Sequence, residues 1–200
     1  MKRSGIALLA GGMIAALALG LFAYTKVLAK FGSGTPPQAV AAHLQADRIL
    51  VSKADHTLKL LRGARLLKTY PIVMGRNWDA GHKQREGDER TPEGAYVIDW
   101  RNARSMAYLS LHISYPNAAD RQAARQGRYS PGGHIMIHGL PNGWGSLAPF
   151  HRLLNWTDGC IAVTNAEMDE IWSLVPNGTP IEITAGSTTS AVSPGSGKSV

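Results

Sequence analysis

Between residues 46 and 184 the sequence is a succession of short segments in which apolar and polar residues alternate, separated by glycine, proline and asparagine. Alternation with a period of two is typical of β-strands, because successive side chains of a strand point to opposite faces of a sheet. The segments 57–62 and 65–74 flank Gly63-Ala64, which predicts a hairpin. We expect the other strands at residues 47–53, 95–100, 106–114, 134–139, 160–163 and 179–184.

Two segments have helical patterns instead. Residues 117–127 are rich in Ala, Arg and Gln and predict a short exposed helix. Thr164 and Glu167 have the spacing of a capping box, and the helix that they open carries one apolar stripe up to Val175. The chain lacks a regular β-α-β alternation and an internal repeat. We therefore predict a compact, mainly antiparallel β domain with one or two helices.

The N-terminus carries an uncharged apolar run at residues 5–24, with Lys2 and Arg3 before it and Lys26 and Lys30 after it. In a helix, a run of this length reaches about 30 Å, the thickness of the hydrocarbon core of a bilayer. We expect an uncleaved anchor in the cytoplasmic membrane; a cleaved signal peptide is the alternative. Either would place the rest of the chain outside the cytoplasm, secreted or periplasmic in the second case.

Four regions follow from these patterns. Residues 1–30 are the expected membrane or signal segment, and residues 31–45, with Gly, Ser and Pro, a linker. Residues 46–184 are the expected folded domain. Residues 185–200 are almost all small or polar, so we expect a disordered tail.

The positive charge of the chain lies mainly outside the folded unit. The net charge is +7, from 21 Lys and Arg against 14 Asp and Glu. Residues 33–197 contain 16 of those basic residues and all 14 acidic ones, a net of +2. Because this unit has neither a basic stripe nor a nucleic-acid-binding motif, we expect no nucleic acid as a partner.

The single cysteine excludes an internal disulfide and is a candidate nucleophile. Cys160 follows Thr157-Asp158-Gly159, a turn directly before an apolar strand. This context would place the thiol at the start of a strand, beside free backbone N–H groups that can hold the oxyanion of an attacked carbonyl. An inert buried cysteine is the alternative.

His138 is the candidate base, because it ends a predicted strand directly before Gly139. His134 lies four residues earlier, and on a strand the two histidines would be about 13 Å apart. With no second cysteine and no His-Glu-x-x-His motif, we expect no metal and no cofactor. His112 and His151 receive no role.

The candidate residues resemble the catalytic core of the L,D-transpeptidase (YkuD-type) cysteine enzymes. The family signature is a His-Gly on one strand followed, some twenty residues later, by Ser/Thr-x-Gly-Cys on the next. Here it matches His138-Gly139 and Thr157-Asp158-Gly159-Cys160. Further upstream, Gly87-Asp88 and residues 90–96 resemble the GD…TPEG-Y stretch of the family, so the similarity spans about residues 48–184.

The resemblance implies a β-sandwich or barrel and action on peptidoglycan stem peptides in the cell envelope. Cys160 would attack the bond between the L-centre of a diamino acid and a terminal D-alanine, with His138 as general acid and base. The N–H groups of Gly159 and Cys160 would form the oxyanion hole, with Thr157, Asp158 and Gly139 in the active-site loops. The acyl group would pass to an amine, forming a cross-link, or to water.

Two positions differ from many members of the family, which carry His before Gly-Cys and Arg two places after Cys. This chain has Asp158 and Ala162 there. Asp158 places a negative charge beside the thiol, which disfavours thiolate. The changes leave the acceptor open, so a hydrolase (an L,D-carboxypeptidase or an amidase) and a non-catalytic wall-binding module stay as alternatives to a transpeptidase.

Three further features have open roles. Trp144 and Trp156 flank the connection from His138 to Cys160, and they line a substrate groove or belong to the core. The charged residues 76–90 form part of the cleft or are solvated. Residues 91–94 predict a turn that leads into a strand.

Overall fold

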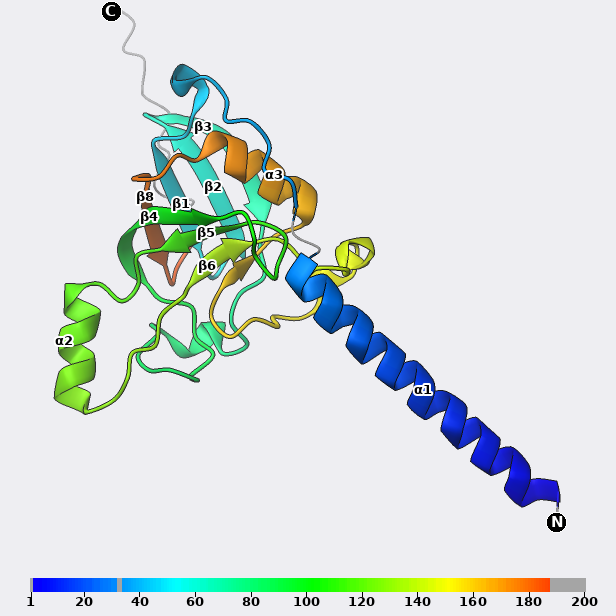
Figure 1. Ribbon diagram of the computed structural model, residues 1–200. Helices are drawn as coiled ribbons and strands as arrows, with labels where there is room; N and C mark the ends of the chain where they lie inside the picture. The colour runs from blue at the N-terminus through cyan, green and yellow to red at the C-terminus, as the bar shows by residue number, and fades with distance from the viewer. Residues whose placement is uncertain (1, 32–33, 188–200) are drawn as a thin grey trace, which may run out of the picture.

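The computed structural model describes residues 2–31 and 34–187, and the side chains of residues 11–24, 27 and 34–187. Figure 1 shows a strongly curved sheet with α3 packed against it and with α1 and α2 projecting from it. The helices are α1 (Lys2–Phe31), α2 (Ala118–Gly127) and α3 (Asn165–Leu174). The strands are β1 (Arg48–Ser52), β2 (Thr57–Arg62), β3 (Arg65–Pro71), β4 (Gly94–Asn102), β5 (Ser110–Ile113), β6 (Met136–His138), β7 (Ile161–Ala162) and β8 (Pro180–Thr184). Short 3-10 helices cover Ala42–Leu44, Trp78–Ala80, Gly145–Leu147 and His151–Leu153.

The eight strands form one sheet in the order β3-β2-β1-β8-β4-β5-β6-β7. The pairs β1/β8 and β6/β7 are parallel, and the other five pairs are antiparallel. The prediction of a mainly antiparallel β fold is confirmed, and so is the hairpin of β2 and β3. β5 and β6 are shorter than the segments 106–114 and 134–139 that alternation predicted, because residues 106–109 form bends and residues 134 and 135 lie outside any strand.

The sheet is one curled layer, which corrects the expectation of a sandwich. β4 belongs to both halves: its first residues pair with β8 and its last residues pair with β5. The register shifts between Ile98 and Arg101, at the point where the two halves meet. A bulge of this kind bends a strand and increases its twist, so a single sheet turns where two sheets would otherwise stack.

The curling brings the two ends of the sheet together. Val73, just beyond β3, forms an isolated bridge with Ala162 of β7, with N···O distances of 2.9 and 2.7 Å. Gly75 forms a second bridge with Thr157. The resulting layer is barrel-like and is closed by these bridges beside the turn that carries Cys160.

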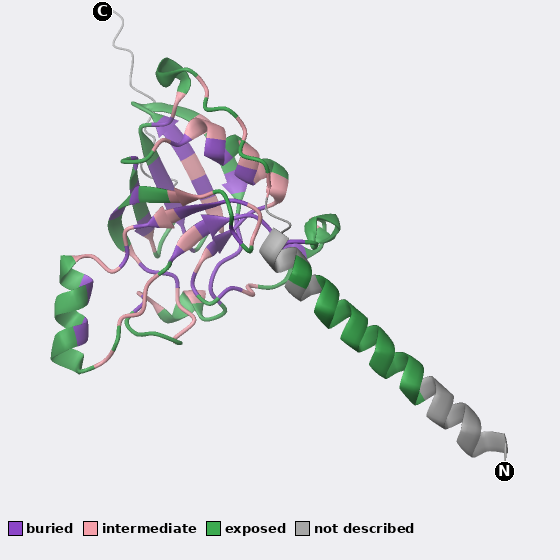
Figure 2. Cartoon of the chain, viewed as in Figure 1, coloured by how far each residue is buried: buried purple, intermediate pink, exposed green. Residues whose placement is uncertain are grey.

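The inner face of the sheet holds the core. Leu111, Ile137 and Ile161 lie side by side in register on β5, β6 and β7, and all three are fully buried. Figure 2 shows this burial concentrated in the strands and in the sheet-facing side of α3. Because side chains alternate along a strand, the neighbours of these residues must project from the outer face.

The capping box predicted for α3 is confirmed. The Thr164 side chain accepts from the N–H of Glu167, and the Glu167 carboxylate accepts from the N–H of Thr164 at 2.8 Å. The predicted apolar stripe is buried against the sheet, at Met168, Ile171, Trp172 and Val175. The helix therefore begins and packs as its local sequence indicates.

α2 is the predicted exposed helix, and it also starts with a capping box. Asn117 accepts from the N–H groups of Ala119 and Asp120, and Asp120 accepts from the N–H of Asn117. The helix ends at Gly127, and the capping residue that follows, Arg128, has a left-handed φ of 56°. Asp120 and Ala124 are its buried residues, and Figure 2 shows the rest of the helix exposed.

The N-terminal apolar segment is helical, since α1 covers it. In the described part of the chain, however, no helix meets the length and apolarity needed to cross a membrane. The predicted membrane anchor therefore has no support from the structure, and the side chains of residues 5–10 of the predicted run lie outside the described ones. Most of the tail predicted at residues 185–200 also lies outside the described residues, which end at 187.

The described part of the expected linker follows the surface of the sheet domain. The Gly34 N–H donates to the carbonyl of Tyr108 at 3.2 Å, and the Val40 N–H donates to the carbonyl of Ser173 at 3.1 Å. Gly34 packs so closely on the Tyr108 ring that a Cβ there would lie 2.3 Å from a ring carbon.

Candidate active site

Sheet register places Cys160 and His138 on the same, outer face of two adjacent parallel strands. Ile137 pairs with Ile161 in the core, and His138 pairs with Ala162. One residue before the first pair, Met136 lies beside Cys160. A strand separation near 4.8 Å and a rise of about 3.3 Å per residue put the Cα atoms of His138 and Cys160 about 8 Å apart. Side chains at that separation on one face can converge on a single reacting group.

The sulfur of Cys160 contacts the backbone of the neighbouring strand. Sγ accepts from the N–H of Met136 at 3.4 Å, and the thiol donates to the carbonyl of His134 at 3.6 Å. His134 has a φ of 55°, a conformation that costs energy for a residue with a Cβ. The structure records no hydrogen bond between Sγ and the imidazole of His138 among the described contacts, so proton transfer between them requires a small side-chain movement.

His138 is buried and its orientation is fixed by the main chain. Nδ1 lies 2.6 Å from the carbonyl oxygen of Gly139. A carbonyl can only accept, so Nδ1 carries the proton and Nε2 of the neutral ring has a free lone pair. Trp156 packs against the ring, with centroids 5.9 Å apart. This arrangement presents Nε2 as a base.

Burial keeps the imidazole neutral. It lowers the pKa of His138 below the ordinary 6.5, and the hydrogen bond to Gly139 acts in the opposite, weaker direction. A neutral imidazole is the form that can take a proton from a thiol.

Burial also keeps the thiol protonated. It raises the pKa of Cys160 above its ordinary value, and the charge of Asp158 raises it further. The N–H of Met136 and the charge of Lys83 act in the other direction. At neutral pH the resting site therefore holds a thiol and a neutral imidazole, which suits proton transfer during attack rather than a standing ion pair.

The turn before Cys160 is held by its own hydrogen bonds. Thr157 Oγ1 donates to the carbonyl of Cys160 at 2.7 Å and accepts from the N–H of Gly159 at 3.3 Å. Gly159 has a φ of 124°, which favours glycine. The N–H of Gly159 that we expect in an oxyanion hole is thus occupied in this structure by a long, weak bond. Asp158 is exposed.

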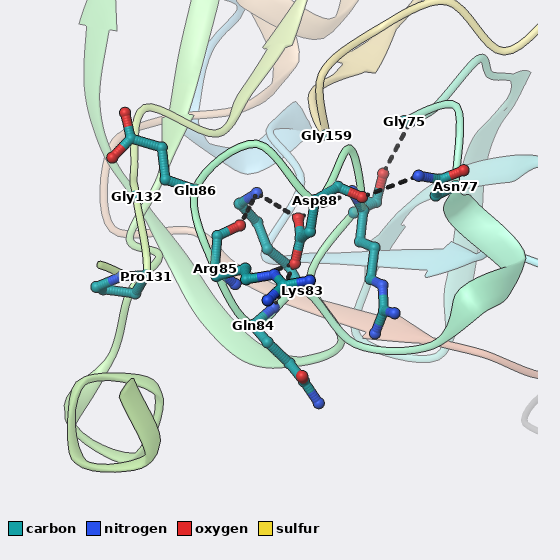
Figure 3. Close-up of polar contacts among 12 residues, drawn as sticks. Gly75, Asn77, Lys83, Gln84, Arg85, Glu86, Asp88, Pro131, Gly132 and Gly159 are labelled. Atoms are coloured by element: carbon teal, nitrogen blue, oxygen red, sulfur yellow. Dashed lines mark hydrogen bonds and ion pairs between the residues drawn. The ribbon is translucent and has the colours of Figure 1, made fainter. Parts of the chain in front are cut away.

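The charged segment 76–90 is an ordered loop built around Asp88 (Figure 3). Its carboxylate accepts from Lys83 Nζ at 2.8 Å and from the N–H groups of Gln84, Arg85 and Arg90 at 2.8, 3.0 and 3.1 Å. Burial alone would raise the pKa of Asp88, but these donors outweigh it and lower the pKa to about 2. The loop is therefore an ordered part of the site and not a loosely held, solvated segment.

This loop supports the turn that carries Cys160. A Cβ on Gly159 would lie 2.5 Å from the carbonyl oxygen of Arg90, and one on Gly75 would lie 2.2 Å from that of Glu89. Asn77 adds hydrogen bonds to the carbonyls of Asp88 and Glu89, both at 3.1 Å. The backbone of residues 88–90 is thus pressed against the Gly75–Thr157 bridge and Gly159 with no room for a side chain.

An apolar cavity of about 490 Å³ lies next to Trp156, the residue that packs against His138. Both tryptophans that flank the connection from His138 to Cys160 line it: Trp144 is 45% exposed, and Trp156 reaches from the cavity to the imidazole. Neither belongs to the buried core cluster. Both tryptophans therefore line a cavity, and Trp156 connects it to the proposed base.

The sequence patterns predict where Cys160 and His138 lie, but they do not predict the residues of the 76–90 loop that support the turn before Cys160. The Gly87-Asp88 motif does not reveal that the Asp88 carboxylate closes the loop. Lys83 has no distinguishing pattern, since it is one basic residue in a charged stretch. His151 is buried in the cavity wall, with no hydrogen-bond partner for either ring nitrogen among the described residues. No group of three or more His, Cys, Asp or Glu in the described chain is arranged to hold a metal ion.

Comparison with known proteins gives matches in sequence and in fold. A family model described as "L,D-transpeptidase catalytic domain" matches residues 46–183. The protein named "Putative L,D-transpeptidase YafK" of Escherichia coli K12 is 32% identical over 133 residues, which cover 64% of this chain and 46% of that protein. "Putative L,D-transpeptidase YkuD" of Bacillus licheniformis is 32% identical over 137 residues, covering 68% of this chain and 65% of that protein. The chain thus spans about half to two thirds of the length of these relatives.

Two solved structures share the fold. A K307A mutant of the helical cell shape determining protein Pgp2 of Campylobacter jejuni superposes with a TM-score of 0.54 at 21% identity, covering 80% of this chain and 54% of that one. Bd1075 of Bdellovibrio bacteriovorus gives a TM-score of 0.51 at 21% identity, covering 78% of this chain and 55% of that one. At such identities the likeness concerns the fold.

Proposed function

The chain belongs to the L,D-transpeptidase catalytic domain family, and we propose that it is a cysteine acyltransferase acting on peptidoglycan stem peptides in the cell envelope. The observation that carries the proposal is the placement of Cys160 and His138 on one outer face, with Nδ1–H of His138 held by a carbonyl. This is the activated-nucleophile arrangement, in which a third group orients the base.

The first half of the proposed reaction forms a thioester. The Cys160 thiol gives its proton to Nε2 of His138 while Sγ attacks the carbonyl between the L-centre of the diamino acid and D-alanine. N–H groups of Gly159 and Cys160 stabilise the oxyanion, after the weak bond from Gly159 to Thr157 opens. The C–N bond breaks, and the imidazolium returns the proton to the departing amine of D-alanine.

The second half transfers the acyl group. The side-chain amine of a second stem attacks the thioester, His138 takes a proton from that amine, and the C–S bond breaks. The proton then returns to the thiolate, which restores the resting site. Water in place of the amine would give an L,D-carboxypeptidase. Asp158 favours this second candidate, because it lies beside the thiol at a position where many members of the family carry His.

Incubation of the full chain with disaccharide-tetrapeptide monomers, followed by mass spectrometry, tests the proposal. We expect D-alanine release and dimers linked between two diamino acids; trimmed monomers alone would support the hydrolase. Cys160→Ala and His138→Gln should each reduce turnover at least about a hundredfold. His43→Gln, at an exposed histidine, is the matched control and should keep full activity. Full activity in Cys160→Ala would contradict both cysteine-dependent enzymes, and no turnover by the wild type would favour a wall-binding module.

A further inference from the structure

A row of side chains crosses four strands on the outer face of the sheet and ends at Cys160. His112 of β5 pairs with Met136 of β6, and Met136 lies beside Cys160. On β4, Trp100 lies next to His112, within the register shift between Ile98 and Arg101. The strand neighbours of His112 and Met136 are buried, and so is Ile161 after Cys160, so these three side chains face away from the core. Trp100 joins the row on this outer face because its ring stacks on His112.

Trp100 and His112 form an aromatic platform at the far end of this row. The two rings stack with centroids 4.8 Å apart and an interplanar angle of 17°. His112 is held in place by Asp99, which lies 2.6 Å from Nδ1. Because one face of the Trp100 ring is covered by His112, its 38% exposure belongs to the other face and the ring edges.

Polar groups surround the platform. One cleft beside it is lined by Trp100, His112 and His134 together with Glu86 and Ser130. An adjoining cleft shares His112 and adds Asp99 and Ser114. An aromatic face with carboxylates and hydroxyls at its rim suits a ligand with an apolar face and many hydroxyl groups, which is the chemistry of a pyranose ring.

The length of the row fits the length of a stem peptide. Steps of about 4.8 Å between strands put His112 about 10 Å and Trp100 about 14 Å from Cys160. The attacked carbonyl belongs to the third residue of a tetrapeptide stem, and three extended residues span about 10 Å. If the stem lies along the row with the attacked carbonyl at Sγ, its first residue lies above His112. The sugar to which that first residue is attached then reaches Trp100.

We propose that the Trp100–His112 platform binds a sugar ring of the glycan strand, so that the site recognises the glycan-linked end of its substrate as well as the stem. The inference rests on the proposed function for the direction of the stem. It makes Trp100 a specificity-determining residue that distinguishes a glycan-linked stem from a free peptide.

Kinetics with two substrates test the platform. For Trp100→Ala in the full chain, kcat/KM with disaccharide-tetrapeptide should fall about three- to tenfold, mainly through KM, and should stay within about twofold with free tetrapeptide. Trp100→Phe should restore most of the loss, because it keeps an aromatic face. Val97→Ala, at an exposed position on the same strand, is the matched control and should change neither substrate.

Binding separates this proposal from the proposed function. Calorimetric titration of disaccharide-tetrapeptide into Cys160→Ala and into Cys160→Ala with Trp100→Ala requires no turnover, and the second protein should bind at least about threefold more weakly. Equal losses with the disaccharide-tetrapeptide and with the free tetrapeptide would overturn the platform in favour of a peptide or structural role for Trp100. Unchanged binding of both would overturn it outright.

Discussion

Replacing Asp88 by Asn should destabilise the protein in a manner that depends on pH. The pKa of Asp88 falls from 3.8 to about 2 on folding, and each pKa unit corresponds to about 1.4 kcal/mol, so the folded state gains about 2 kcal/mol from the ionised carboxylate. Lys83 is 3% exposed and would lose its partner, which raises the expected cost at pH 7 to about 2–5 kcal/mol.

The sign of the pH dependence follows from the lowered pKa. A group whose pKa is depressed in the folded state contributes stability above its unfolded pKa, and that contribution disappears as the pH falls through the folded value. The difference between wild type and Asp88→Asn should thus be complete at pH 5–7 and should shrink between about pH 4 and 2.

Urea unfolding followed by tryptophan fluorescence at several pH values measures this difference. Asp79→Asn, an exposed acid of the same loop, is the matched control and should change the free energy of unfolding by less than about 0.5 kcal/mol. The reasoning would be refuted if the free energies of unfolding of wild type and Asp88→Asn differed by less than about 0.5 kcal/mol at pH 7. It would also be refuted if their difference were as large in acid as at pH 7.

Three shorter predictions concern the turn and the two proposed catalytic groups. Gly159→Ala should lower turnover at least about tenfold, because a Cβ there lies 2.5 Å from the Arg90 carbonyl and the φ of 124° is strained; unchanged kinetics would contradict the tight packing. Lys83→Met should move alkylation of Cys160 by iodoacetamide to higher pH, because the lysine charge lowers the thiol pKa; a shift to lower pH would oppose that role. The acid limb of kcat/KM should have its midpoint below pH 6.5, since burial lowers the pKa of His138 and only the neutral ring accepts the proton; a midpoint above 6.5 would show a different base.

Local sequence patterns predicted the elements whose signals are local. The capping box of Thr164 and Glu167 starts a helix because its two hydrogen bonds lie within four residues. The hairpin at Gly63 and the strands that contribute to the core follow from alternation and turn residues. The positions of His138 and Cys160 at a strand end and before a strand were predictable for the same reason.

Features that depend on distant pairing could not be predicted in this way. The row from Trp100 to Cys160 exists because the bulge after Ile98 sets the register of β4 against β5, and a slip of one residue would turn each side chain to the other face. The order of the loop at residues 76–90 depends on Asp88 closing it, and a charged sequence does not reveal which carboxylate accepts from the backbone. The closure of the curled sheet depends on the bridge from Val73 to Ala162, which joins distant parts of the chain.

The group that orients the proposed base has a consequence for how this site can change in evolution. Every residue type carries a carbonyl, so no codon change at position 139 deletes the acceptor for Nδ1 of His138, whereas an aspartate in that role could be lost in one step. The vulnerable property is the path of the main chain. A Cβ on Gly139 would lie 2.7 Å from Asn165 Oδ1 and 2.8 Å from Cβ of Tyr108. Selection at this position therefore acts on the volume of the side chain. Even alanine would displace the carbonyl that sets the tautomer of His138.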